Sequence, residues 1–245
     1  MELAIWTVVF FLLVYEPIVT YIGFQKFKQD VKTNPFARTK LYMNTIIGLW
    51  AVTLFILLIV IGTELTLEEI GIRWPTLNDE ILGPVVTYAA LGIVMCYLLV
   101  LLYYFIGYRY SETIRTQFLQ AREKEREKIG FSEILPVTQK EKKLWNYVSI
   151  TAGVTEELIY RGFLIFAFTH LFPQLPIGVV ILLASLTFGL AHTYQGIMGV
   201  LKTTAAGVVF SVLYLSFGSI LPSIVVHFLI DYFAKIGEDR AEAPA

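Results

Sequence analysis

The chain has 245 residues, of which 56% are hydrophobic and 16% are charged, with a formal net charge of −1 and a mean hydropathy of +0.67. This composition excludes an ordinary soluble domain, and the near-neutral charge gives no indication of nucleic-acid binding. The single cysteine, Cys96, excludes an internal disulfide framework and a cysteine-based metal site. We therefore expect a multi-pass protein of the lipid bilayer.

Long apolar runs define the predicted membrane spans, because a helix needs roughly 20 mostly apolar residues to cross about 30 Å of hydrocarbon. In chain order the expected spans are Leu3–Ile22, Leu41–Ile61, Pro84–Ile106, Trp145–Thr169, Pro176–His192, Ile197–Phe217 and Ile220–Ala234. The first run is longer than a signal-peptide core and has no basic leader, so we expect it to be retained. The sequence predicts an all-α transmembrane bundle of about seven spans, or eight if one segment is re-entrant.

The charges of the predicted loops alternate in sign along the chain. The first loop, "FQKFKQDVKTNPFARTK", is basic, the second, Gly62–Leu82, is acidic apart from Arg73, and the third, Gly107–Leu144, is again rich in Lys and Arg. The positive-inside rule places the first and third loops in the cytoplasm and the second outside. We therefore expect the N-terminus outside and, with seven spans, the C-terminus in the cytoplasm.

The third loop divides the chain into parts of different character. Its segment "TQFLQAREKEREKIGFSEI" has alternating charges at helical spacing, which predicts a solvated helical extension of the third span. Before it, the predicted spans contain one formal charge, Glu16, beside Pro17. The expected parts are three N-terminal spans (1–106), a charged cytoplasmic connector (107–144), a polar four-helix membrane core (145–236) and a frayed tail (237–245).

The stretch "TEELIYRGF" places three charges inside a predicted span. Glu157 and Arg161 are four residues apart on one helical face, in the favoured acid-before-base order, and can neutralise each other. Glu156 points about 100° away and has no candidate partner in its own helix except Tyr160. A structural ion pair is the alternative interpretation, but ionisable groups inside a membrane are functional by default. Glu156 is therefore a candidate general acid or base.

Two histidines recur with a second notable residue at i, i+4 spacing. Phe188 and His192 lie in "TFGLAHTYQG", and His227 and Asp231 lie in "PSIVVHFLIDYF". A lone histidine on an apolar helix is more often a core residue, but both histidines and Glu156 fall in the predicted cytoplasmic half of the membrane. His170 falls at the outer end of its span, where we expect a loop residue.

These residues together suit peptide-bond hydrolysis without a covalent intermediate. A carboxylate and an imidazole facing one water can deprotonate it, and a second imidazole with another polar group can stabilise the oxyanion. No serine or cysteine nucleophile constellation is evident, although Ser149, Ser185 and Ser211 stay open as individual candidates. A zinc site built from Glu156, His192 and His227 is the alternative, although no H-E-x-x-H spacing is present.

Three segments resemble the motifs of the CPBP family, also called the CAAX protease and bacteriocin-processing or abortive-infection family. "EELIYRG" resembles its E-E-x-x-x-R motif, "FGLAH" its F-x-x-x-H motif and "HFLID" its H-x-x-x-N/D motif, in matching order and spacing over Trp145–Phe233. The family includes the type II CAAX prenyl endopeptidases, which cleave prenylated proteins at the cytosolic membrane face. The resemblance implies a glutamate-type intramembrane protease that needs no metal or other cofactor.

The resemblance also implies a role for each motif residue. Glu156 and His192 would activate the water, and His227 with Asp231 would line the oxyanion site. The supporting residues would be Glu157 and Arg161, which hold the helix and orient Glu156, and Phe188, which shapes the site. The expected substrate is a membrane-associated protein or peptide, prenylated or not.

Asp231 departs from the CAAX proteases, which typically have asparagine at that position. An asparagine amide can donate a hydrogen bond to an oxyanion, whereas an ionised carboxylate would oppose its charge. Asp231 is thus expected either to be protonated or to orient His227.

Two other functions remain open at the level of sequence. One is a non-catalytic membrane scaffold or chaperone of the same family, in which the polar cluster serves folding. The other is a proton-coupled transporter that uses Glu156 and the histidines as a relay, although no inverted repeat is visible.

Overall fold

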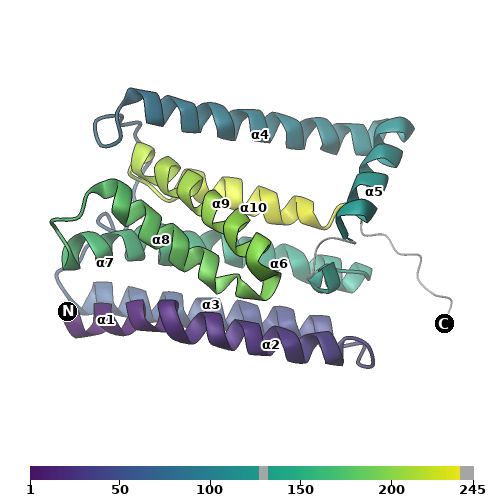
Figure 1. Ribbon diagram of the computed structural model, residues 1–245, viewed down its shortest axis with the longest axis horizontal. Coiled ribbons are helices and arrows are strands. Elements are labelled where there is room, and N and C mark those ends of the chain that lie inside the picture. The colour runs from purple at the N-terminus through teal and green to yellow at the C-terminus, as the bar shows by residue number, and fades with distance from the viewer. Residues whose placement is uncertain (127–131, 238–245) are drawn as a thin grey trace.

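The structure is a computed structural model that describes residues 1–126 and 132–237 (Figure 1). Every regular element in these residues is helical, which confirms the predicted all-α fold. The predicted frayed tail lies outside the described residues from position 238 onward.

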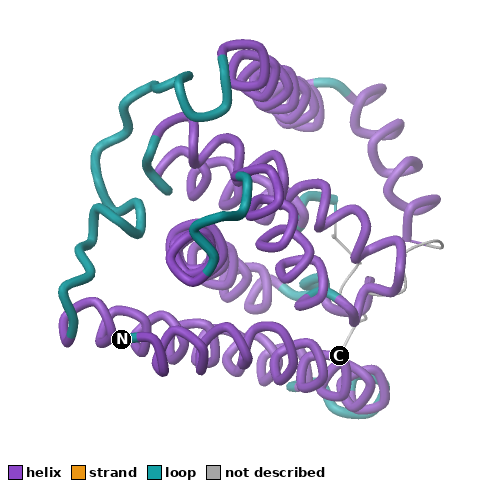
Figure 2. The backbone as a smooth tube through the Cα atoms, turned by 60° about the vertical axis from the view of Figure 1, so that its left-hand side comes forward, coloured by secondary structure: helices purple, strands orange, loops and turns teal. Residues whose placement is uncertain are grey.

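Most of the helices run roughly along one direction, as columns of a bundle (Figure 1). In the first half the elements are α1 (Glu2–Phe10), the π-helical η1 (Phe11–Tyr15), α2 (Glu16–Asp30), α3 (Ala37–Gly62), α4 (Pro84–Tyr110) and α5 (Glu112–Arg126). In the second half they are η2 (Ser132–Ile134), α6 (Gln139–Glu156), the π-helical η3 (Glu157–Phe163), α7 (Leu164–Leu171), α8 (Ile177–Ala191), η4 (Thr193–Gln195), α9 (Gly196–Phe217) and α10 (Leu221–Ala234). The column α1–η1–α2 and α3 lie along one side, α4 along the opposite side, and the remaining columns between them (Figures 1 and 2).

Within the described residues, four helical segments are long and apolar enough to cross a membrane by length and composition. They are Glu2–Asp30, Ala37–Gly62, Pro84–Tyr110 and Thr193–Phe217. The helices α8 and α10 are apolar but have only 15 and 14 residues. At about 1.5 Å per residue each is shorter than the hydrocarbon core. Several membrane helices are therefore present, and the total of seven spans stays a prediction.

The charged connector differs from the predicted extension of the third span. It forms the separate helix α5, which turns away from the axis of α4 (Figure 1). Ser111 between the two helices has an extended backbone, with φ −125° and ψ 118°, so the helix breaks there. Gly107 allows α5 to fold back closely, because a Cβ at this position would lie 2.6 Å from the side chain of Ile114. Residues 127–131 of the predicted segment lie outside the described residues.

The first and third loops meet at one end of the bundle. The Arg38 Nε donates a hydrogen bond to the Glu133 carbonyl at 2.8 Å, and Lys28 Nζ lies 3.8 Å from the Glu133 carboxylate. The acidic loop between α3 and α4 lies at the opposite end and passes from one side of the bundle to the other (Figure 2). The basic loops thus share one end, as their charge pattern predicts.

Small residues allow two helix pairs to pack closely around the polar core. In α8, a Cβ at Gly189 would lie 2.0 Å from the hydroxyl of Thr204 and 2.9 Å from the carbonyl of Val200, both in α9. In α6, a Cβ at Gly153 would lie 3.2 Å from the α10 backbone. Such close approach is characteristic of helix packing in membranes. It brings α6, α8, α9 and α10 together around the motif residues.

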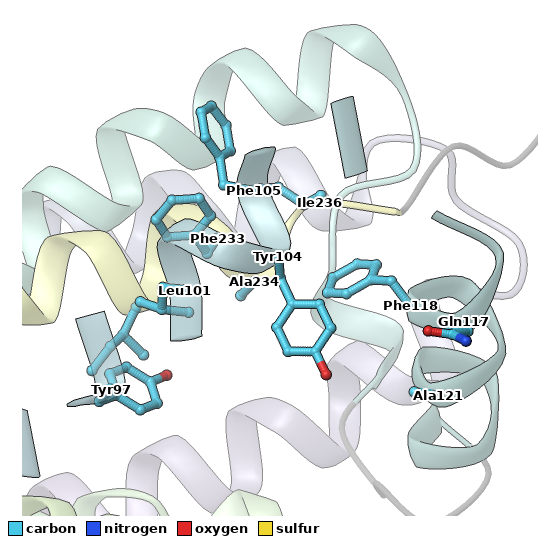
Figure 3. Close-up of a pocket in the computed structure, with 11 residues that line it drawn as sticks. Tyr97, Leu101, Tyr104, Phe105, Gln117, Phe118, Ala121, Phe233, Ala234 and Ile236 are labelled. Atoms are coloured by element: carbon cyan, nitrogen blue, oxygen red, sulfur yellow. The ribbon is translucent and has the colours of Figure 1, made fainter. Parts of the chain in front are cut away.

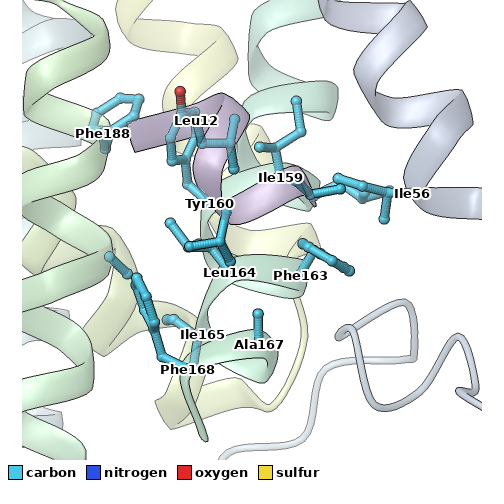
Figure 4. Packing of buried hydrophobic residues seen from close by; sticks show 14 of the residues in the cluster. Leu12, Ile56, Ile159, Tyr160, Phe163, Leu164, Ile165, Ala167, Phe168 and Phe188 are labelled. Atoms are coloured by element: carbon cyan, nitrogen blue, oxygen red, sulfur yellow. The ribbon is translucent and has the colours of Figure 1, made fainter. Parts of the chain in front are cut away.

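The largest hydrophobic cluster surrounds η3 and α7 (Figure 4). Fully buried side chains such as Ile159, Phe163 and Leu164 pack there against Leu12 of η1 and Ile56 of α3. The N-terminal column is therefore part of the same packed core as the second half of the chain.

Candidate active site

The column that carries the two adjacent glutamates changes its helical form at the site. Glu156 is the last residue of α6, and Glu157 opens the π-helix η3, whose seven residues are all buried. A π-turn inserts an extra residue into a helical turn, and such turns occur frequently at functional sites. The distortion of this helix therefore coincides with its charged residues.

A buried layer of the site is formed by one carboxylate that accepts two hydrogen bonds. The Glu157 Oε1 accepts from the Arg161 Nη1 at 2.9 Å and from the His227 Nδ1 at 2.7 Å. The exposed fraction of the side chain is 0% for Glu157, 1% for Arg161 and 8% for His227. The predicted Glu157–Arg161 ion pair is confirmed, and His227 is a second hydrogen-bond partner of the same carboxylate. Glu157 thus holds the His227 ring in place, whereas the family resemblance implied that Glu157 and Arg161 orient Glu156.

Two phenylalanines enclose this layer. The Arg161 guanidinium lies 4.2 Å from the ring centre of Phe188 and 5.0 Å from that of Phe210. Phe210 also stacks on His227, with ring centres 5.5 Å apart and an angle of 24° between the planes. Cation–π attraction is strongest where water is excluded, so these rings stabilise the buried arginine. Phe210 was not predicted, since one phenylalanine in the apolar sequence of α9 carries no distinguishing signal.

The second ring nitrogen of His227, Nε2, faces the carboxylates of Glu156 and Asp231. Its Nε2 lies 3.8 Å from the Glu156 Oε2 and 3.7 Å from the Asp231 Oδ2. Both distances exceed a hydrogen bond. The carboxylate side chains are 14% and 30% exposed, in contrast to the closed layer behind them. Asp231 therefore makes no hydrogen bond to the His227 ring, and its backbone carbonyl accepts one from the Trp145 Nε1 at 2.8 Å.

His192 lies where α8 ends, with a non-helical backbone (φ −99°, ψ 20°). Its Nδ1 is 2.8 Å from the Phe188 carbonyl, which can only accept, so Nδ1 carries a hydrogen. In the neutral ring the Nε2 then has a free lone pair. The Phe188 ring contacts His192 at 4.7 Å and His227 at 6.3 Å between centres. Among the described residues no hydrogen bond or ion pair joins His192 to Glu156, so Phe188 connects the two halves of the site.

Glu16 belongs to the same neighbourhood, although none of the three motifs contains it. The Tyr160 hydroxyl donates a hydrogen bond to the Glu16 Oε2 at 2.6 Å. Tyr160, the candidate partner of Glu156 in its own helix, thus donates its hydroxyl hydrogen to Glu16. The available signal was the presence of a single formal charge in the first three predicted spans.

The remaining candidates lie apart from these contacts. His170 is in the last turn of α7 and stacks on Phe166 at 5.5 Å, so the expected loop position is wrong. The Ser149 hydroxyl donates to the carbonyl of Trp145 in its own helix. Within the described residues no group of three or more His, Cys, Asp or Glu side chains is arranged to hold a metal ion.

An apolar pocket of about 450 Å³ lies between α4, α5 and α10 (Figure 3). Its lining is largely aromatic and aliphatic, and includes Tyr104 and Phe105 of α4, Phe118 of α5, and Ile230 and Phe233 of α10. Ile230 directly precedes Asp231, so one helix provides a wall of the pocket and a carboxylate of the site.

Comparison with known proteins gives one informative match. Residues 141–233 match the family described as type II CAAX prenyl endopeptidase Rce1-like. No curated protein and no solved structure matches the chain. The matched range contains the two glutamates, Arg161, both site histidines and Asp231.

Proposed function

We propose that the chain is an intramembrane endopeptidase that cleaves near the C-terminus of a membrane-associated protein, because residues 141–233 match the Rce1-like family of CAAX prenyl endopeptidases. The observation that carries the proposal is the division of the site into two layers. Glu157 and Arg161 are closed off and hold His227, while Glu156 and Asp231 are partly open. A fixed imidazole beside an accessible carboxylate is suited to acid–base chemistry.

In this proposal Glu156 is the general base. It accepts a proton from one water, whose oxygen attacks the carbonyl carbon of the scissile bond and forms a tetrahedral oxyanion. The free Nε2 of His192 can accept a hydrogen bond from the same water when substrate and water are bound. The proton on Glu156 then passes to the departing amide nitrogen as the C–N bond breaks, which yields a carboxylic acid and an amine.

His227 is proposed to stabilise the oxyanion. Its Nδ1 is occupied by Glu157, so the Nε2 is the nitrogen that can donate towards a substrate. A preorganised donor in a site shielded from water stabilises a developing charge more strongly than it would in water. The carboxylate of Glu157 balances the positive charge that the ring carries when both nitrogens hold hydrogen.

The substrate is proposed to carry a hydrocarbon chain, and a prenylated C-terminus fits. The pocket between α4, α5 and α10 supports this proposal, because it is apolar and shares α10 with the site. A chain anchored there would keep the attached peptide close to Asp231 and His227. Burial of each CH₂ group contributes about 0.8 kcal/mol, so a chain of this kind would contribute substantially to binding.

The test is incubation of the purified protein, in lipid nanodiscs, with matched prenylated and unprenylated C-terminal peptides, with and without a chelator. We expect cleavage, with a lower KM for the prenylated peptide. Glu156→Gln is expected to lower kcat by about 10²- to 10⁴-fold, the usual contribution of a general base. Glu68→Gln, an exposed carboxylate in the acidic loop, is the matched control. Full activity of purified Glu156→Gln would contradict the mechanism, and loss of activity with chelator alone would indicate a metal enzyme.

A further inference from the structure

Glu16 is a carboxylate without a role in the proposed reaction. It lies near the middle of the Glu2–Asp30 segment, outside the range matched by the family, and its neighbours in the sequence are apolar. An ionisable side chain at membrane depth is costly, and an apolar residue would serve helix packing at lower cost. It accepts a hydrogen bond from Tyr160, the residue that precedes Arg161 in the sequence.

Both partners of this hydrogen bond are associated with π-helical turns. Glu16 directly follows η1, and Tyr160 lies within η3. Each π-turn departs from regular helical hydrogen bonding, and such turns occur frequently at functional sites. Two columns distant in sequence are thus distorted at the point where their polar side chains meet.

One route of contacts leads from Glu16 to His192 through aromatic rings. The Tyr160 ring packs edge-on against Phe188, with centres 5.1 Å apart. Phe188 in turn packs against His192 at 4.7 Å. The Arg161 guanidinium also lies 4.2 Å from the centre of the Phe188 ring and limits the movement of that ring. A shift of Tyr160 would therefore be passed to Phe188 and to His192.

Hydrogen bonds from Thr20 and Thr193 tie both sides of His192 to α2, independently of the Glu16 carboxylate. The Thr20 hydroxyl lies 2.8 Å from the Glu16 carbonyl and 3.3 Å from the Ala191 carbonyl. The Thr193 hydroxyl donates to the Pro17 carbonyl at 3.2 Å. The residues before and after the histidine are thus both tied to α2, starting at the turn that contains Glu16.

The position of His192 depends on such external contacts. It lies beyond the last regular turn of α8, so the helix alone does not fix its backbone. Tyr194, which follows it, packs on Phe24 of α2 at 5.2 Å and on the His192 ring at 5.8 Å. The N-terminal column therefore supports the turn that carries this histidine.

We propose that Glu16 is a positioning residue for His192, acting through Tyr160 and Phe188. The N-terminal column would then be a working part of the enzyme, although it lies outside the matched family range. The inference rests on the proposed function, because His192 is there assigned to the water.

Kinetics of four variants on the prenylated peptide test the proposal. Tyr160→Phe removes the hydroxyl and keeps the ring, and Glu16→Ala removes the carboxylate. Each is expected to lower kcat roughly tenfold to hundredfold, the range for loss of a hydrogen bond to a charged group, with KM changed less than about twofold. The double variant is expected to be no worse than either single variant, because both remove one contact. Glu16→Gln keeps an acceptor for Tyr160 and is expected to regain most of the activity.

A purely structural role is tested by Glu16→Leu. This variant is expected to be as resistant to heat as the parent protein, since it removes a costly charge, yet to lose kcat like Glu16→Ala. Glu2→Gln and Tyr21→Phe, both exposed on the same column, are the matched controls and are expected to be unchanged. Full activity of Glu16→Leu, or additive losses in the double variant, would overturn the proposal.

A second readout does not depend on catalysis. Diethylpyrocarbonate modifies histidine rings, and peptide mapping gives a separate rate for each of the three histidines. We expect Glu16→Ala and Tyr160→Phe to change the rate at His192 about threefold or more, with the rate at His170 as an internal control. Unchanged rates at His192 in both variants would overturn the proposal.

The two readouts separate the inference from the proposed function. If the parent protein cleaves no peptide but the His192 rate responds to Glu16, the protease assignment fails and the positioning contact stands. If Glu156→Gln abolishes cleavage and the Glu16 variants are fully active, the protease stands and the inference fails.

Discussion

At the scale of single residues, the two ring nitrogens of His227 define what Asp231 can do. The Nδ1 is held by Glu157 at 2.7 Å, while the Asp231 carboxylate lies 3.7 Å from the Nε2. Orientation of the ring therefore comes from Glu157. In the proposed reaction Asp231 would donate a hydrogen bond to the oxyanion, and it can do so only when protonated.

This geometry predicts the effect of Asp231→Asn. The amide supplies the donor directly and leaves the Glu157–His227 hydrogen bond intact, so kcat should stay within about fivefold of the parent or rise. Asp231→Leu, of similar size but without a polar group, should lower kcat by about 10²-fold or more. Steady-state kinetics of the two variants on one peptide decide the question. A loss of hundredfold in Asp231→Asn would show that an ionised carboxylate is required.

At the scale of elements, the close contact of α8 and α9 fixes the helix that ends at His192. Gly189 has no room for a side chain, because a Cβ would meet the α9 backbone at 2.9 Å. Gly178, in the same helix, has nothing within 4 Å of the corresponding position. The two glycines thus lie in the same helix, but only Gly189 is packed against a neighbouring helix.

Gly189→Ala is therefore expected to destabilise the protein by about 1–3 kcal/mol, the usual cost of overpacking. Gly178→Ala should be neutral or stabilising by up to about 1 kcal/mol, because alanine is the better helix former. Thermal unfolding of both variants in detergent measures the difference. Equal midpoints for the two variants would contradict the close packing of α8 against α9.

At the scale of the whole molecule, the basic loops gather at one end of the bundle and the acidic loop lies at the other (Figures 1 and 2). Arg38 and Glu133 join the first loop to the third, so both must lie on the same side of the membrane. The positive-inside rule predicts that this side is the cytoplasmic one.

The orientation is testable because Cys96 is the sole cysteine and can be replaced by serine. In this background Lys32→Cys, in the basic loop, should react with a membrane-impermeant maleimide only after the membrane is opened. Glu68→Cys, in the acidic loop, should react in intact cells. Both positions are exposed, so burial does not limit labelling. The reverse pattern would place the site on the outer side.

The sequence by itself determined the all-α fold, the membrane setting, the family resemblance and the identity of the polar residues. These follow from local properties: apolar run length, loop charge, and the i, i+4 spacing of Glu157 with Arg161 and of His227 with Asp231. The break at Ser111 was not predicted, since no glycine or proline separates α4 from α5 there.

Only the tertiary structure decided which polar groups contact one another. The helical spacing gave Glu157 a partner in its own helix but could not show His227 from α10 as the second. It also left Glu16 without a role, because Tyr160 lies on a column far away in the sequence. Contacts between helices depend on how the columns pack, and at Gly153 and Gly189 that packing is set by the absence of a side chain.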